Sequence, residues 1–183
     1  MITSAREIPI NLAVKNLRQR ILDVGGGELD LWKRMVIEDE LLFDQLFSLI
    51  FGDDHRLAWR ACWIIDNASE AFPDLLANQI PTIINGFLTT KDGSLKRHFT
   101  RILCRYPIPV EYMSAVIDRS FGLLSPTEPV SVRVFAMQLL FNCTNELPEL
   151  KGELIIVLEH LVEEGGSAGF INRSGKLLRK LRY

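Results

Sequence analysis

The chain has 183 residues, of which 48% are hydrophobic and 24% are charged, a composition typical of one globular domain. Its formal net charge is −2, which excludes attraction of the whole molecule to nucleic acid or to an anionic membrane and leaves only a local basic patch for such a role. Cys62, Cys104 and Cys143 are odd in number and far apart, which favours reduced, intracellular thiols over a disulfide framework.

The amino-terminal segment is too polar for a signal peptide, and no apolar run reaches the ~18 residues that a membrane helix needs. We therefore expect a cytoplasmic protein that does not enter a membrane.

The first predicted helix extends to Val24 and ends at Gly25, Gly26 and Gly27. These glycines do not form a phosphate-binding loop, because no Gly-Lys-Ser/Thr follows them and no strand precedes them. A hinge or tight turn is the better interpretation. The apolar residues of this helix recur at helical spacing at Ile10, Val14, Leu17, Ile21 and Val24.

Proline, glycine and aspartate punctuate the rest of the chain, and no stretch has the pattern of a strand. Pro81 is expected to start or kink the main part of its helix, and Ser94 to cap the next one. Gly165 and Gly166 form the last predicted turn. The helices predicted after the triple glycine cover 28–37, 39–51, 55–72, 75–90, 95–106, 110–124, 130–146, 147–164 and 168–182.

The predicted helix 55–72 carries two tryptophans on its polar side. Projection at about 100° per residue separates an apolar face from a face rich in arginine. Large aromatic side chains are costly to leave in water, so two of them among arginines indicate either packing against a neighbouring helix or a surface that a partner covers. The polar face contains Arg56, Trp59, Arg60, Trp63, Asp66, Asn67 and Glu70.

An arginine recurs near the start of every second helix, at positions separated by 37, 36 and 40 residues. Arg60 and Arg97 fall on the polar sides of their helices, whereas Arg133 projects nearer the apolar side, so the four positions are not all equivalent. The recurring residues are Arg60, Arg97, Arg133 and Arg173.

This pattern resembles the HEAT-repeat family, whose unit is an apolar helix, a turn with Asp, and a second helix that begins with a Val-Arg pair. Here the matching pieces are Asp53 with Arg60, Asp92 with Arg97, and Arg133 within PVSVRVFAMQLL. The resemblance covers about residue 39 to the carboxyl terminus. It implies an all-α superhelix of helical hairpins with about nine to ten helices. The whole chain, 1–183, would be a single domain, with capping helices in 1–38 and about four helix pairs in 39–183.

By the same resemblance, the second helix of each pair would line a concave face. We expect a groove there for a protein partner that is acidic or carries phosphate, since interface anchors are enriched in Trp and Arg. Nucleic acid is the less favoured partner, and self-association stays open. In the competing interpretation the arginines pair with Asp66, Glu70 and acids on neighbouring helices and hold the repeats in register. The predicted partner-binding residues are Arg56, Trp59, Arg60, Trp63, Arg97, Arg101 and Arg105.

Catalytic, cofactor-binding and metal-ligating patterns are not found in the sequence. The three histidines lie on separate predicted helices, and no nucleophile elbow or dinucleotide fingerprint occurs. One enzymatic alternative is a HEAT-like DNA glycosylase of alkylation repair, in which Trp59 or Trp63 would act with Asp66 and Arg101. The net negative charge and the short chain disfavour it.

Overall fold

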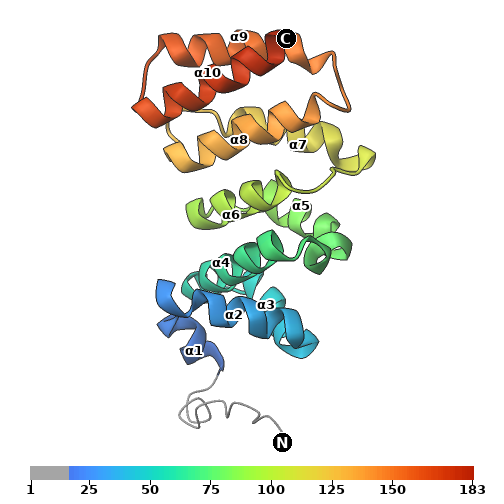
Figure 1. Cartoon of the computed structure of the whole chain (residues 1–183), viewed down its shortest axis with the longest axis vertical. Coiled ribbons are helices and arrows are strands. Elements are labelled where there is room, and N and C mark those ends of the chain that lie inside the picture. The colour runs from blue at the N-terminus through green and yellow to red at the C-terminus, as the bar shows by residue number, and fades with distance from the viewer. Residues whose placement is uncertain (1–16) are drawn as a thin grey trace, which may run out of the picture. The chain divides into compact units, whose positions relative to one another are not determined.

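The computed structural model describes residues 17–183, which form helices and turns and contain no strand (Figure 1). The predicted helical positions Ile10 and Val14 lie outside the described residues. The chain forms two compact units, the first ending at Ala68 and the second extending over Ser69–Tyr183. The all-α prediction is confirmed for the described part of the chain.

The first unit contains three helices and the larger part of a fourth. A 3-10 helix at the triple glycine confirms the predicted turn, and α2 packs against α3. The carboxylate of Asp39 accepts a hydrogen bond from the Leu42 amide at 3.0 Å and so caps α3. Asp54 does the same for the following helix, accepting from the amides of Arg56 and Leu57. The elements are α1 (Leu17–Asp23), η2 (Gly26–Glu28), α2 (Leu29–Glu38), α3 (Glu40–Ile50) and α4 (His55–Ala71), which continues into the second unit.

The second unit is built from three helical hairpins preceded by a 3-10 helix. Pro81 lies in the first turn of its helix, as predicted, where its missing amide proton costs nothing. The elements are η3 (Pro73–Gln79), α5 (Ile80–Thr89), α6 (Gly93–Leu103), α7 (Val110–Gly122), α8 (Val130–Cys143), α9 (Leu150–Glu163) and α10 (Ala168–Arg182).

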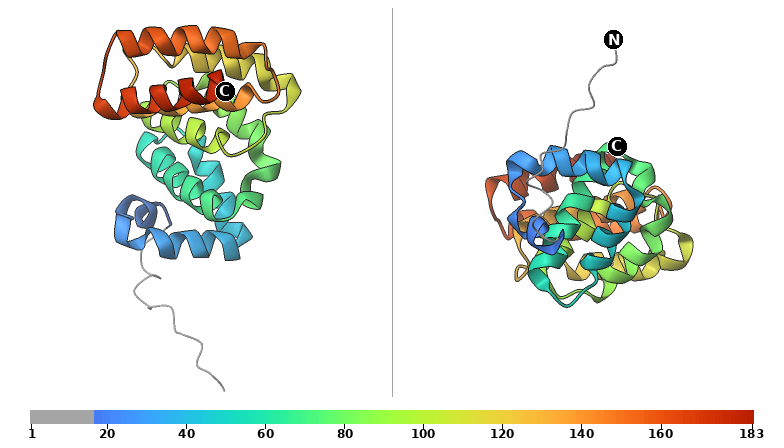
Figure 2. Two further views of the ribbon diagram at one scale, coloured as in Figure 1. Left: turned by 45° about the horizontal axis from the view of Figure 1, so that its top comes forward. Right: turned by 90° about the horizontal axis from the view of Figure 1, so that it is seen from below.

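The hairpins of the second unit stack through their second helices. Each first helix packs on its own partner, in the pairs α5 with α6, α7 with α8, and α9 with α10. Across hairpins, α8 lies between α6 and α10 (Figures 1 and 2). Among the first helices, α7 packs on α5 but has no comparable packing against α9. Each pair has too little apolar surface to fold alone, and its neighbours cover the remainder.

Two predicted helices end three residues earlier than the sequence suggested. The predicted helices 95–106 and 130–146 stop at Leu103 and Cys143, because the last residues turn more tightly through bonds to the third preceding carbonyl. The prediction of Ser94 as an N-cap was wrong. The carboxylate of Asp92 accepts from the Leu95 amide at 2.9 Å, and Ser94 lies inside the first turn.

The turn between α9 and α10 confirms the predicted Gly165 and Gly166. Gly165 has φ +84°, a conformation that side chains disfavour, and the Ser167 hydroxyl then caps α10 by accepting from the Phe170 amide. None of the helices within residues 17–183 is long and apolar enough to cross a membrane.

Candidate interaction surface

In the first unit, the predicted site residues of α4 surround Arg60. One of its guanidinium nitrogens donates to the Val24 carbonyl at 2.5 Å, and the group lies 4.4 Å from the ring centre of Trp59 and 5.8 Å from that of Trp63. Both indoles are half-buried, whereas Arg56 is exposed. Arg60 therefore ties α4 to the end of α1 and shields two aromatic rings at the same time.

In the second unit, Arg101 and Arg105 hold α6 to the residues that end α4. Arg101 donates to the Glu70 carboxylate at 2.5 Å, and Arg105 donates to the Ser69 hydroxyl at 3.0 Å. In the sequence analysis, this structural role was the competing interpretation to partner binding. That interpretation included pairing of the arginines with Glu70, as Arg101 shows. Arg97 is exposed instead.

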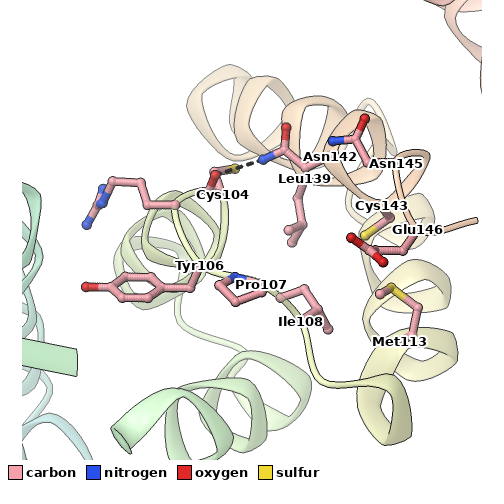
Figure 3. Close-up of a pocket in the computed structure, with 11 residues that line it drawn as sticks. Cys104, Tyr106, Pro107, Ile108, Met113, Leu139, Asn142, Cys143, Asn145 and Glu146 are labelled. Atoms are coloured by element: carbon pink, nitrogen blue, oxygen red, sulfur yellow. Dashed lines mark hydrogen bonds between the residues drawn. The ribbon is translucent and has the colours of Figure 1, made fainter. Parts of the chain in front are cut away.

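Amide side chains continue these bridges along the stack. The Asn142 side chain donates to the Cys104 carbonyl at 2.8 Å, as the dashed line in Figure 3 marks. Gln138 donates to Asn142 at 2.6 Å, and Arg173 of α10 donates to Gln138. The polar stripe of α8 thus joins α6 to α10, and each bridge satisfies groups that burial would otherwise leave unpaired.

Arginines also satisfy carbonyls at helix carboxyl ends, a role that the sequence analysis missed. Arg133, which is 9% exposed, donates to the Leu124 carbonyl at 3.0 Å just after α7, and Arg119 donates to the Thr90 carbonyl at 2.9 Å just after α5. The last carbonyls of a helix have no intrahelical partner and carry partial negative charge, so a guanidinium suits them. The one signal for this role was the position of Arg133 near the apolar side of its helix.

Charge is segregated between first and second helices of the second unit. No Asp or Glu occurs in α6, α8 or α10, whereas α7 and α9 carry Glu111, Asp118, Glu153, Glu159 and Glu163. Three exposed cations of α6 and α10 form neither an ion pair nor a contact with an aromatic ring within residues 17–183. These are Arg97, Lys176 and Arg179.

A cavity of about 350 Å³ lies where the α6–α7 loop meets the end of α8. Figure 3 shows Cys143 and Met113 on one side of it and Cys104 with Asn142 on another. Burial raises the pKa of the Cys143 thiol from 9.0 to about 11, so the group stays protonated and is a poor nucleophile at neutral pH. The cavity therefore offers no activated thiol at Cys143.

A family model of the HEAT repeat domain matches residues 14–181. The chain belongs to the HEAT-repeat family. The resemblance inferred from Arg60, Arg97 and the Val-Arg pair at Arg133 is confirmed. Neither a comparison with curated proteins nor one with solved structures finds a match. HEAT-repeat stacks typically present extended binding surfaces, and the family indicates a protein-interaction scaffold.

Two features of this HEAT-repeat chain bear on the enzymatic alternative. Asp66, the residue that a glycosylase reaction would require beside the sugar, has no exposed surface. Within residues 17–183, no group of three or more His, Cys, Asp or Glu could hold a metal ion. No observation on these residues favours the glycosylase over the scaffold.

Proposed function

We propose that this HEAT-repeat chain is a non-catalytic scaffold module that binds an acidic peptide or a phosphate-bearing protein partner on the basic face of its second helices. The observation that carries the proposal is the absence of Asp and Glu from α6, α8 and α10. Cations without neighbouring acids leave a positive potential that attracts an anionic segment and orients it.

The basic side chains divide into two groups with different tasks. Arg101 and Arg105 are engaged with Glu70 and Ser69 and hold α6 to the end of α4, and Arg173 is engaged with Gln138 and holds α10 to α8. The exposed cations defined above, Arg97, Lys176 and Arg179, have their charge available to a partner. The sequence also predicted the arginines and tryptophans of α4 as partner-binding residues, and of these Arg56 is exposed.

The test reverses the exposed charges and leaves the structural ones intact. The variant Arg97→Glu, Lys176→Glu, Arg179→Glu is compared with a control that reverses three exposed cations elsewhere, Arg34→Glu, Lys91→Glu, Lys151→Glu. The probes are a fluorescein-labelled peptide of alternating Glu and Ser, its phosphoserine form, and an uncharged Gly-Ser peptide, measured by fluorescence anisotropy.

Wild-type protein should bind both anionic peptides and not the Gly-Ser peptide. The site variant should bind them at least about tenfold more weakly, since each rim charge contributes up to ~1 kcal/mol. The control should keep wild-type affinity within about twofold. An equal loss of peptide affinity in both variants would mean that net charge alone explains the binding. Failure of wild-type protein to bind either anionic peptide would refute the proposal.

A further inference from the structure

An apolar opening of about 670 Å³ lies beside α7, on the side where α7 lacks packing against α9. We call it the α7 groove. Its apolar wall comes from Val110, Met113 and Ile117 of α7 and from Leu147 between α8 and α9. Met113 and Glu146 also line the cavity in Figure 3, so the two openings share a border. The α7 groove exists because the next first helix does not cover this face.

Met113 and Ile117 are buried in the wall of the α7 groove, at 7% and 9% exposure, whereas its other two apolar residues reach the surface. Val110 is 86% exposed, and Leu147 is half-buried. Openings of a few hundred Å³ with mainly apolar walls and a few polar groups are the usual form of a binding site. Met113 adds an adaptable wall, because its unbranched side chain can adjust to different occupants.

The charges of the α7 groove have one sign. Asp118 and Glu146 are its charged lining residues, and no Lys, Arg or His lines it. Both carboxylates are exposed, as is Glu111 beside Val110, and the described residues offer these three no ion pair. An occupant that brings positive charge next to an apolar group would therefore meet complementary chemistry.

We propose that the α7 groove docks a short segment of a protein partner in which apolar side chains are flanked by Lys or Arg. The apolar side chains enter beside Met113 and Ile117, and the cations face Asp118 and Glu146. This site is separate in chemistry from the basic face of the second helices and does not depend on it. A chain with both sites would join a basic segment of one partner to an acidic segment of another.

The experiment uses the full chain and four labelled peptides of equal length. One combines leucines with lysines, a second replaces the lysines by glutamates, a third replaces them by serines, and a fourth keeps the lysines but replaces the leucines by serines. Anisotropy should show binding of the leucine–lysine peptide at least about tenfold tighter than that of the other three. Methyl NMR of the four methionines should show a shift at Met113, assigned from a Met113→Leu sample.

Two variants alter the α7 groove at exposed positions, so that folding is preserved. The first is Val110→Lys, and the second combines Asp118→Lys with Glu146→Lys. Each should weaken the binding of the leucine–lysine peptide by about tenfold. The matched controls are Ile156→Lys, which is 68% exposed on α9, and Glu153→Lys with Glu163→Lys. These controls should bind as wild type does, and so should the triple Glu variant of Arg97, Lys176 and Arg179.

Three results would overturn the proposal. The first is equal binding of the leucine–lysine and leucine-free lysine peptides, which would mean charge attraction alone. The second is an equal loss of affinity for the leucine–lysine peptide in the groove variants and in their controls. The third is a wild-type dimer in light scattering that Val110→Lys dissociates, which would make a second copy of the chain the occupant. If the acidic peptides do not bind to the basic face, the proposal for the α7 groove is unaffected. The two proposals can therefore be refuted separately.

Discussion

The side chain of Arg133 connects three helices by reaching the carbonyl of Leu124. Its Nε atom donates to that carbonyl at 3.0 Å, just after the end of α7, and its guanidinium lies 4.2 Å from the ring centre of Phe170 on α10. Arg133 itself belongs to α8 and is 9% exposed. One buried cation therefore caps a helix within its hairpin and packs against the next hairpin.

Removing this side chain should be costly. We expect Arg133→Ala to lower the free energy of unfolding by about 3 kcal/mol, because the Leu124 carbonyl loses its donor and the Phe170 ring loses the cation above it. Urea denaturation measures the change through the midpoint. The matched control, Arg97→Ala at an exposed position, should stay within about 0.5 kcal/mol of wild type. Equal effects of the two substitutions would show that the Arg133 bridge is not stabilising.

The cap of α6 should depend on Asp92 and not on Ser94. The Asp92 carboxylate accepts a hydrogen bond from the Leu95 amide, so Asp92→Ala should lower the free energy of unfolding by about 1 kcal/mol in denaturant unfolding. Asp92→Asn should retain most of the stability that the cap contributes. Ser94→Ala should be neutral or slightly stabilising, because alanine is the better residue inside a helix. A larger loss for Ser94→Ala than for Asp92→Ala would contradict the assignment.

The ion pair between Lys96 and Glu128 should couple α6 to the loop before α8. Its side chains are only 13% and 17% exposed, so water screens it less than a surface pair. In a double-mutant cycle with Lys96→Met and Glu128→Gln, we expect a coupling energy of about 1–2 kcal/mol that changes little with salt.

The exposed pair between Arg182 and Glu159 is the comparison for Lys96–Glu128. Its side chains are 52% and 41% exposed, so its coupling should be below about 0.5 kcal/mol and should fall as salt is added. Equal coupling energies in the two cycles would rule out any special role of burial for the Lys96–Glu128 pair.

The thiol of Cys143 should make stability depend on alkaline pH. Its pKa is raised from 9.0 to about 11 by burial, so between these values the unfolded chain releases a proton that the folded chain keeps. The stability that the protonated thiol contributes is complete below pH 9 and is lost as the pH rises toward 11. The stability advantage of wild type over Cys143→Ala should therefore shrink by about 1 kcal/mol between pH 9 and pH 10.

Other groups titrate in the same range, so the difference between wild type and variant is the quantity to follow. Cys143→Val should give the same pH trend as Cys143→Ala, since neither side chain ionises. A wild-type advantage that does not change with pH would mean that the folded and unfolded thiols share one pKa.

Local chemistry was sufficient to predict most of the helices. Pro81 at a helix start and the glycine pair after α9 act through their own backbone preferences, which do not depend on distant residues. The ends of α6 and α8 were placed too late for a related reason. Each final turn changes from α-helical to 3-10 bonding, and side-chain periodicity does not reveal that change.

The sequence by itself determined an all-α chain of the HEAT-repeat family, because apolar spacing and recurring turns are properties of neighbouring residues. Only the tertiary structure decided what each arginine does. Arg60 reaches a carbonyl 36 residues away, and Arg133 reaches one 9 residues away, so the same residue type at comparable repeat positions has different partners. Such hydrogen bonds depend on where packing brings an unpaired carbonyl, and a linear pattern of residues does not contain that information.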